Sequence, residues 1–153
     1  MFTQDTLPIL FTAYAFLAQM LLIFNFAALR WRPRIQQRWG WIVYTTGLFA
    51  LPLGILFLAA GQRWYLGLAF VLLAVWAAFG YTVDILRPVR WRQPIHWQIF
   101  APYVLLYISA QFAFWIPLWF IGPGYWIFYA MLYTISTALN VSMHFPSRST
   151  PPL

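Results

Sequence analysis

The chain contains no cysteine and no lysine, and its 153 residues include two acidic residues, both aspartate. The absence of cysteine excludes disulfides, thiolate nucleophiles and cysteine metal ligands. The absence of lysine excludes Schiff-base chemistry. Charged residues make up only 7% of the chain and hydrophobic residues 63%. This is too little charge to cover the surface of a water-soluble domain of this size.

The chain contains long apolar runs, and each is long enough to cross a bilayer as a helix. The triplet Gly122-Pro123-Gly124 breaks helix strongly and divides the last apolar stretch in two. We therefore predict an all-α, polytopic membrane helix bundle with five transmembrane helices. Residues 1–145 would form one domain, and 146–153 a disordered cytoplasmic tail. The expected spans are about 7–29, 41–60, 64–86, 98–121 and 125–144.

Eight of the nine arginines lie in alternate connections between these runs or in the tail, and Arg63 is the exception. Basic residues concentrate in loops that stay on the cytoplasmic side, so the N-terminus is expected outside and the C-terminus inside. This topology accounts for the net charge of +7 without a nucleic-acid partner. We therefore expect a multi-pass membrane protein, and we place it in a bacterial or archaeal cytoplasmic membrane. Seven arginines are expected to contact anionic lipid head groups: Arg30, Arg32, Arg34, Arg38, Arg87, Arg90 and Arg92.

Asp84 lies within the third run, about one turn before its cytoplasmic end. A carboxylate inside a bilayer is costly unless it is paired, which makes Asp84 a candidate functional residue. A structural ion pair is the favoured interpretation, because Arg87 follows at i+3. We expect Asp84 to pair with Arg87 or with an arginine of the first cytoplasmic loop.

A polar stripe follows the fifth run, where Ser136, Asn140 and His144 are spaced four residues apart. Lipid offers an amide no partner, so this stripe should face the bundle interior, and so should Gln19 and Gln111. Interhelical hydrogen bonds explain any one of these residues. Together they also suggest a pocket for an amphipathic ligand, on the cytoplasmic half between the fourth and fifth spans. The candidate ligand-binding residues are Tyr103, Tyr107, Gln111, Tyr133, Ser136, Asn140, His144 and Asp84.

His96 and His144 should lie at a similar depth near the cytoplasmic face, together with Asp84. Two histidines and a carboxylate are a minimal ligand set for a metal or haem, although their spacing matches no metal motif. The same three side chains are the candidates for a lipid-modifying enzyme. No catalytic motif supports an enzyme, so we predict neither a catalytic residue nor a resident cofactor.

The overall plan, with about 150 residues, five expected spans and ten tryptophans, resembles the tryptophan-rich sensory proteins of the translocator-protein family. The segments Gln111-Phe-Ala-Phe-Trp-Ile-Pro117 and Leu139-Asn140 resemble family motifs, at a different separation. The resemblance implies a helical bundle that binds porphyrins or sterol-like ligands. The family's run of a tryptophan, paired prolines and Val-Phe-Pro before its second span has no counterpart here, so the resemblance does not establish membership.

Two functional hypotheses follow from these features. The first is a small, non-enzymatic membrane protein that binds a lipid, a sterol-like molecule or a pigment in an intramembrane pocket. The second is an accessory or assembly subunit, whose polar stripes and aromatic residues pack within a homodimer or a larger membrane complex. A seam without a cavity between the last two spans would favour the second.

Overall fold

The computed structural model describes residues 6–61, 63–87, 92 and 94–143, and every regular element in these ranges is a helix. The helices follow one another along the chain as α1 (Thr6–Trp31), α2 (Pro33–Leu48), α3 (Ala50–Ala59), α4 (Trp64–Tyr81), the π-helical turn η1 (Thr82–Leu86), α5 (Trp97–Ile121) and α6 (Pro123–Ser142). The expected all-helical fold is thus confirmed for the described part of the chain.

Four helical segments are long and apolar enough to cross a membrane: Thr6–Trp31, Pro33–Ala59, Trp64–Leu86 and Trp97–Ile121. The remaining helix, α6, spans 20 residues but is less apolar. Its tyrosines, its hydroxyl-bearing residues and Asn140 lower its mean hydropathy. The chain is therefore a helical protein with several segments suited to a membrane, and α6 is the one whose composition departs from the others.

The first arginine-rich connection is shorter than the sequence predicts. The expected spans leave residues 30–40, with four arginines, as the connection, but a single residue, Arg32, separates α1 from α2. Pro33 occupies the first turn of α2, where a missing N–H costs nothing and the fixed φ favours helix. Arg34 and Arg38 therefore stand on the first turns of a helix rather than in a loop.

The long segment Pro33–Ala59 is interrupted at Phe49, between α2 and α3. Pro52 explains the position of this break, because it has no N–H to donate to the carbonyl of Leu48. The sequence predicts a bend or a local opening at each of the three prolines inside the expected spans, Pro52, Pro102 and Pro117. Pro102 and Pro117 behave differently, since α5 continues through both of them.

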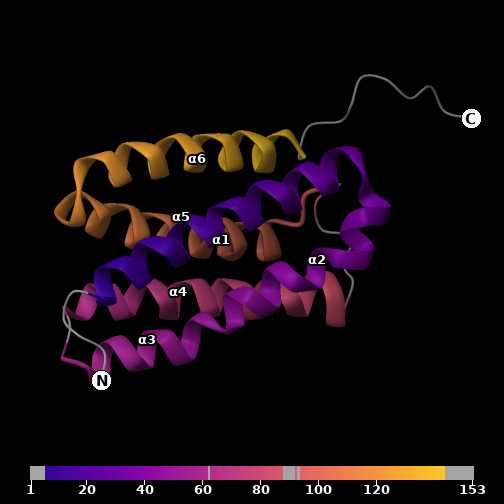
Figure 1. The fold of residues 1–153 in the computed structure, drawn as a ribbon. Helices are drawn as coiled ribbons and strands as arrows, with labels where there is room; N and C mark the ends of the chain where they lie inside the picture. Colours follow the sequence, from indigo (N-terminus) through magenta and orange to yellow (C-terminus); the bar gives the residue numbers. More distant parts are fainter. Residues whose placement is uncertain (1–5, 62, 88–91, 93, 144–153) are drawn as a thin grey trace, which may run out of the picture.

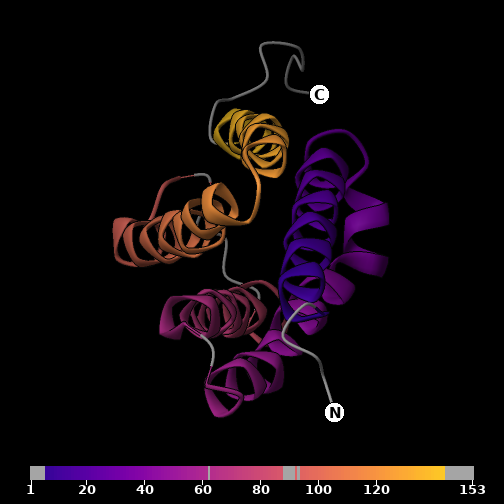
Figure 2. The ribbon, with the colours of Figure 1, turned by 60° about the vertical axis from the view of Figure 1, so that its left-hand side comes forward.

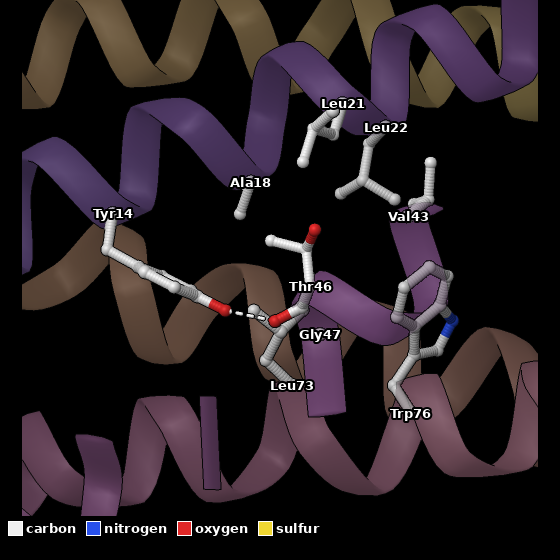
Figure 3. Close-up of a pocket in the computed structure, with 9 residues that line it drawn as sticks. All are labelled: Tyr14, Ala18, Leu21, Leu22, Val43, Thr46, Gly47, Leu73 and Trp76. Carbon is white, nitrogen blue, oxygen red and sulfur yellow. Dashed lines mark hydrogen bonds between the residues drawn. The ribbon is translucent and has the colours of Figure 1, made fainter. Parts of the chain in front are cut away.

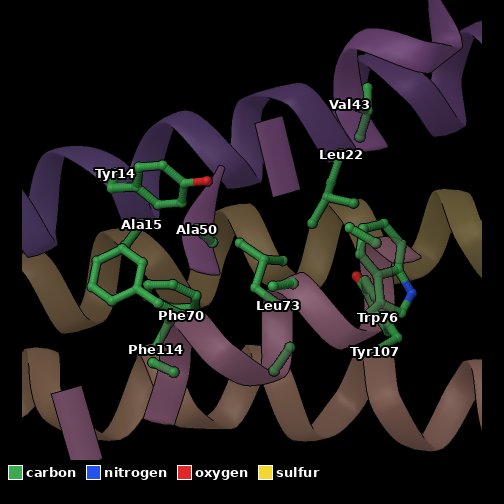
Figure 4. Packing of buried hydrophobic residues seen from close by; sticks show 14 of the residues in the cluster. Tyr14, Ala15, Leu22, Val43, Ala50, Phe70, Leu73, Trp76, Tyr107 and Phe114 are labelled. Carbon is green, nitrogen blue, oxygen red and sulfur yellow. The ribbon is translucent and has the colours of Figure 1, made fainter. Parts of the chain in front are cut away.

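The long helices run side by side, and α4 lies between α3 and α5 (Figure 1). The turned view shows α1 beside α2 on one side and beside α6 on the other (Figure 2). Aromatic side chains of α4 fill the space that these helices enclose, as Figure 4 shows for Phe70 and Trp76. The ring centroid of Phe70 lies 5.6 Å from that of Phe11 on α1 and 5.3 Å from that of Phe114 on α5.

Candidate functional site

Asp84 lies in the π-helical turn η1 and forms a bidentate ion pair with Arg92. The Nη1 and Nη2 atoms of Arg92 donate to Oδ1 and Oδ2 of Asp84, each over 2.8 Å. The hydroxyl of Tyr44 also donates to Oδ2, and the Asp84 side chain is only 6% exposed. Gly80 leaves room for this contact, because a Cβ at residue 80 would collide with the Tyr44 ring.

The pairing of Asp84 is confirmed, but its described partner is not the arginine that the sequence suggests. Arg87 is exposed and caps η1 with φ −130° and ψ 75°, so its backbone has already left the helix. The i+3 neighbourhood of an α-helix therefore does not apply to Asp84 and Arg87. The π turn, closed by a hydrogen bond from the N–H of Arg87 to the carbonyl of Thr82, is the physical reason for the difference.

Arg92 also lies over the ring of Tyr103, with its Cζ 5.8 Å from the ring centroid. Burial by itself would lower the pKa of the Arg92 guanidinium. The hydrogen bond and the negative charge of Asp84 outweigh burial and raise that pKa above its usual value. Tyr44, Asp84, Arg92 and Tyr103 are called the ion-pair layer below.

Aromatic rings fill the bundle next to the ion-pair layer. The ring of Trp76 lies 5.8 Å from Tyr44, 5.7 Å from Tyr103 and 6.1 Å from Tyr107, measured between centroids. Phe26 of α1 adds an edge contact to Tyr107 at 5.9 Å. Trp76, Tyr44, Tyr103 and Tyr107 are all buried, so this half of the bundle is closely packed.

Buried amides tie together three helices in the middle of the bundle. Nε2 of Gln19 on α1 donates to Oε1 of Gln111 on α5. The hydroxyl of Tyr129 on α6 donates to the same oxygen over 2.8 Å. The prediction that Gln19 and Gln111 point inward is confirmed, since they are 0% and 2% exposed. These three residues are called the amide layer below.

The polar stripe of α6 also faces inward where it is described. Ser136 and Asn140 are buried, and Ser136 Oγ shares a 2.9 Å hydrogen bond with the hydroxyl of Tyr107. Tyr133 is half-buried and packs against Tyr107, with 6.4 Å between ring centroids. His144 lies outside the described residues. Ser136 and Tyr107 therefore bond to each other across the α5–α6 seam.

Some buried polar atoms have no hydrogen-bond partner among the described residues. Both side-chain atoms of Asn25 are in this position, as are Oδ1 of Asn140 and Nε1 of Trp76. Buried polar atoms are usually paired with protein groups or with water. The sequence expectations did not include Asn25. It is nevertheless recognisable in the sequence of α1 as a single polar residue among apolar neighbours.

The arginines expected at lipid head groups lie in different environments. Arg32, Arg34, Arg38 and Arg87 are exposed. Arg30 instead donates from Nη1 to the carbonyl of Ser142 over 3.2 Å, where a cation stabilises the C-terminal end of α6. Arg92 is engaged by Asp84, and Arg90 lies outside the described residues.

Of the three side chains expected as a metal or catalytic set, the structure describes His96 and Asp84, and His144 lies outside the described residues. His96 is exposed at the N-terminal cap of α5. No group of three His, Cys, Asp or Glu side chains that could hold a metal occurs among the described residues. Asp84 is held in the ion-pair layer, where its carboxylate accepts hydrogen bonds from Arg92 and Tyr44.

A cavity of about 10 Å³ lies among α1, α2 and α4. Figure 3 shows its lining, in which the hydroxyl of Tyr14 points to the backbone carbonyl of Thr46 and donates to it. This volume is close to the minimum for one water, and a buried water needs several polar partners. The cavity is therefore a packing defect rather than a ligand site.

Two larger cavities adjoin at the opposite end of the bundle from the ion-pair layer. One of about 250 Å³ lies between α4 and α5 and is lined by Trp64, Tyr65, Leu68, Ala113, Ile116, Pro117 and Phe120. The other, of about 330 Å³, is lined by Pro8, Arg63, Tyr65, Leu66, Pro117, Phe120 and Ile121. They share Tyr65, Pro117 and Phe120, and together they are called the Arg63 groove. No pattern in the sequence indicated this groove, although Arg63 was the exceptional arginine.

No family model, no curated protein and no solved structure matches the chain. The resemblance in overall plan to the tryptophan-rich sensory proteins is therefore not accompanied by a match in sequence or fold.

Proposed function

We propose that the protein is a non-enzymatic integral membrane protein that binds a hydrophobic or amphipathic ligand within its helical bundle. The Arg63 groove is the observation that carries this proposal. Its larger part, about 330 Å³, is at the lower end of small-ligand pockets, which run from about 300 to 1,000 Å³. The groove combines aromatic and aliphatic walls with one guanidinium, the arrangement that suits an amphipathic molecule. Hydrogen bonds join α5 and α6 where the sequence suggested a pocket, which by itself favours the accessory subunit, so the ligand-binding proposal rests on the Arg63 groove.

A retained ligand is expected after gentle purification. Extraction of the purified protein followed by mass spectrometry and an absorption spectrum should reveal one class of bound molecule. Ala113→Phe should remove that molecule, because the new ring fills the part of the groove that Ala113 lines. Ala101→Phe is the matched control, since residue 101 is an exposed alanine near the other end of the same helix. Equal retention by both variants, or an empty wild-type protein, would contradict the proposal.

We further propose that α6 spans the membrane together with the four apolar segments, with the N-terminus outside and the arginine-rich ends inside. The chain has no cysteine, so single reporters can be added. Gln37 and Gly124 are exposed at opposite ends of the bundle, whereas Gln36 is buried and unsuitable. In intact cells, an impermeant maleimide should label Gly124→Cys and should label Gln37→Cys only after the membrane is opened. The reverse pattern would overturn this orientation.

A specific observation supports the second candidate, an accessory or assembly subunit. A surface depression of about 590 Å³ lies on α6 and is lined by Tyr133, Thr134, Thr137, Ala138, Val141 and Ser142. Small and hydroxyl-bearing residues allow close helix contacts in membranes. Loss of stability whenever the protein is isolated from other subunits would favour this function, while a stable isolated protein that retains a ligand favours the first.

A further inference from the structure

Arg63 stands apart from the other arginines that the structure describes. It precedes α4 and lies at the opposite end of that helix from Asp84 and Arg92. Asp84, the acid within the described ranges, is already paired at that far end. Arg63 is exposed, and its Nη1 donates to the hydroxyl of Tyr65 over 2.8 Å. This bond holds the guanidinium beside the groove without supplying a negative charge.

The Arg63 groove has a polar part and an apolar part that meet at Tyr65, Pro117 and Phe120. Arg63 lines the cavity of about 330 Å³. The neighbouring cavity, of about 250 Å³, is an apolar slot between α4 and α5. Trp64 and Phe120 line the slot, and each is 67% exposed. In a bilayer the slot would therefore be reached sideways from the lipid, with Trp64 at interface depth.

The chemistry of the two parts suits a phospholipid, and the net charge of the head group decides which one. Surrounding hydrocarbon is as apolar as the slot, so apolar contact alone discriminates little between ligands. A guanidinium forms paired, charge-assisted hydrogen bonds with phosphate oxygens, and it is weakly hydrated compared with an ammonium. Selectivity must then come from Arg63 and from the charge of the head group.

We infer that the Arg63 groove binds one anionic phospholipid, with the phosphate on Arg63 and an acyl chain in the slot between α4 and α5. This inference rests on the proposed function and names its ligand class. Charge complementarity carries it, because a cation without an acid among its described neighbours lines the cavity that adjoins an apolar slot. The head-group arginines expected from the sequence lie at the other end of the bundle.

Photoactivatable phosphatidylglycerol tests the inference directly. The purified full chain is reconstituted in phosphatidylcholine vesicles with a small fraction of phosphatidylglycerol that carries a diazirine in one acyl chain. Adducts are mapped by peptide mass spectrometry, and phosphatidylcholine with the same chain serves as the neutral comparison. Phosphatidylglycerol should label 64–68 and 113–120 about fivefold more than phosphatidylcholine, equivalent to about 1 kcal/mol for one arginine near the surface.

Arg63→Gln should reduce phosphatidylglycerol labelling of these segments to the phosphatidylcholine level. Arg34→Gln, which removes an exposed arginine from the other end of the bundle, should leave it unchanged. Equal labelling of the groove by both lipids would overturn the inference while leaving hydrophobic ligand binding intact. If neither lipid labelled the groove, both this inference and the proposed binding of a hydrophobic ligand there would be contradicted. The labelling by phosphatidylglycerol could also depend on Arg63 only after Asp5→Asn has been introduced. That result would mean that Arg63 pairs with the Asp5 carboxylate in the wild-type protein, and it would overturn the inference.

Discussion

Asp84→Asn should destabilise the protein by about 3–5 kcal/mol, the usual cost of leaving one member of a buried ion pair without its counter-charge. Asparagine keeps the shape of the side chain but leaves the Arg92 guanidinium facing a neutral group. The Asp84 side chain is only 6% exposed and that of Arg92 21%, so water compensates little. Unfolding of the purified protein in detergent, followed by tryptophan fluorescence, measures the loss.

Arg87→Gln is the control that separates the observed pair from the one that sequence spacing suggests. Arg87 is exposed, and its replacement should change the stability by less than about 0.5 kcal/mol. Arg92→Gln should cost about as much as Asp84→Asn. A destabilising Arg87→Gln beside a neutral Arg92→Gln would refute the described pairing. Unchanged stability of Asp84→Asn with lost ligand retention would instead assign Asp84 a functional role.

Gln111→Leu should destabilise the protein more than Gln19→Leu. Oε1 of Gln111 accepts from both Gln19 and Tyr129, so its removal leaves two buried donors unpaired, at about 1–3 kcal/mol each. Removal of Gln19 leaves the bond from Tyr129 in place. The double variant should cost less than the sum of the two single variants, because it leaves fewer orphaned groups.

Denaturation of the two single variants and the double variant gives the coupling energy of the amide layer. Gln98→Leu is a suitable control, since Gln98 is exposed near the start of α5. Additive effects of the two buried substitutions would show that the Gln19–Gln111 bond contributes nothing of its own. A larger effect of Gln19→Leu than of Gln111→Leu would contradict the described hydrogen bonds.

The sequence predicts best those features that follow from a shortage of polar partners. Gln19, Gln111 and Ser136 had to face inward because lipid provides nothing to bond with, and they do. The helical class and the break near Pro52 followed from composition and from a missing N–H. The sequence does not show which buried amide pairs with which, because the pairing depends on how the helices rotate and cross.

The same limit explains the errors around Asp84 and in the first connection. Spacing on an α-helix suggested Arg87, but one π-helical turn changes the face that each residue occupies. Arginines suggested a loop from Arg30 to Arg38, where Pro33 in fact starts a helix. The Arg63 groove is a gap between side-chain shapes on α4, α5 and the start of α1, and no periodicity in the sequence encodes such a gap.

The bond between Gln19 and Gln111 joins residues 92 positions apart, which has a consequence for the time course of synthesis. At roughly 5–20 residues per second, a ribosome needs on the order of 5–18 s to make the intervening chain. During that interval the first helix carries an amide whose final partner does not yet exist. An inserting α1 must keep Gln19 beside water, head groups or the insertion machinery until α5 arrives.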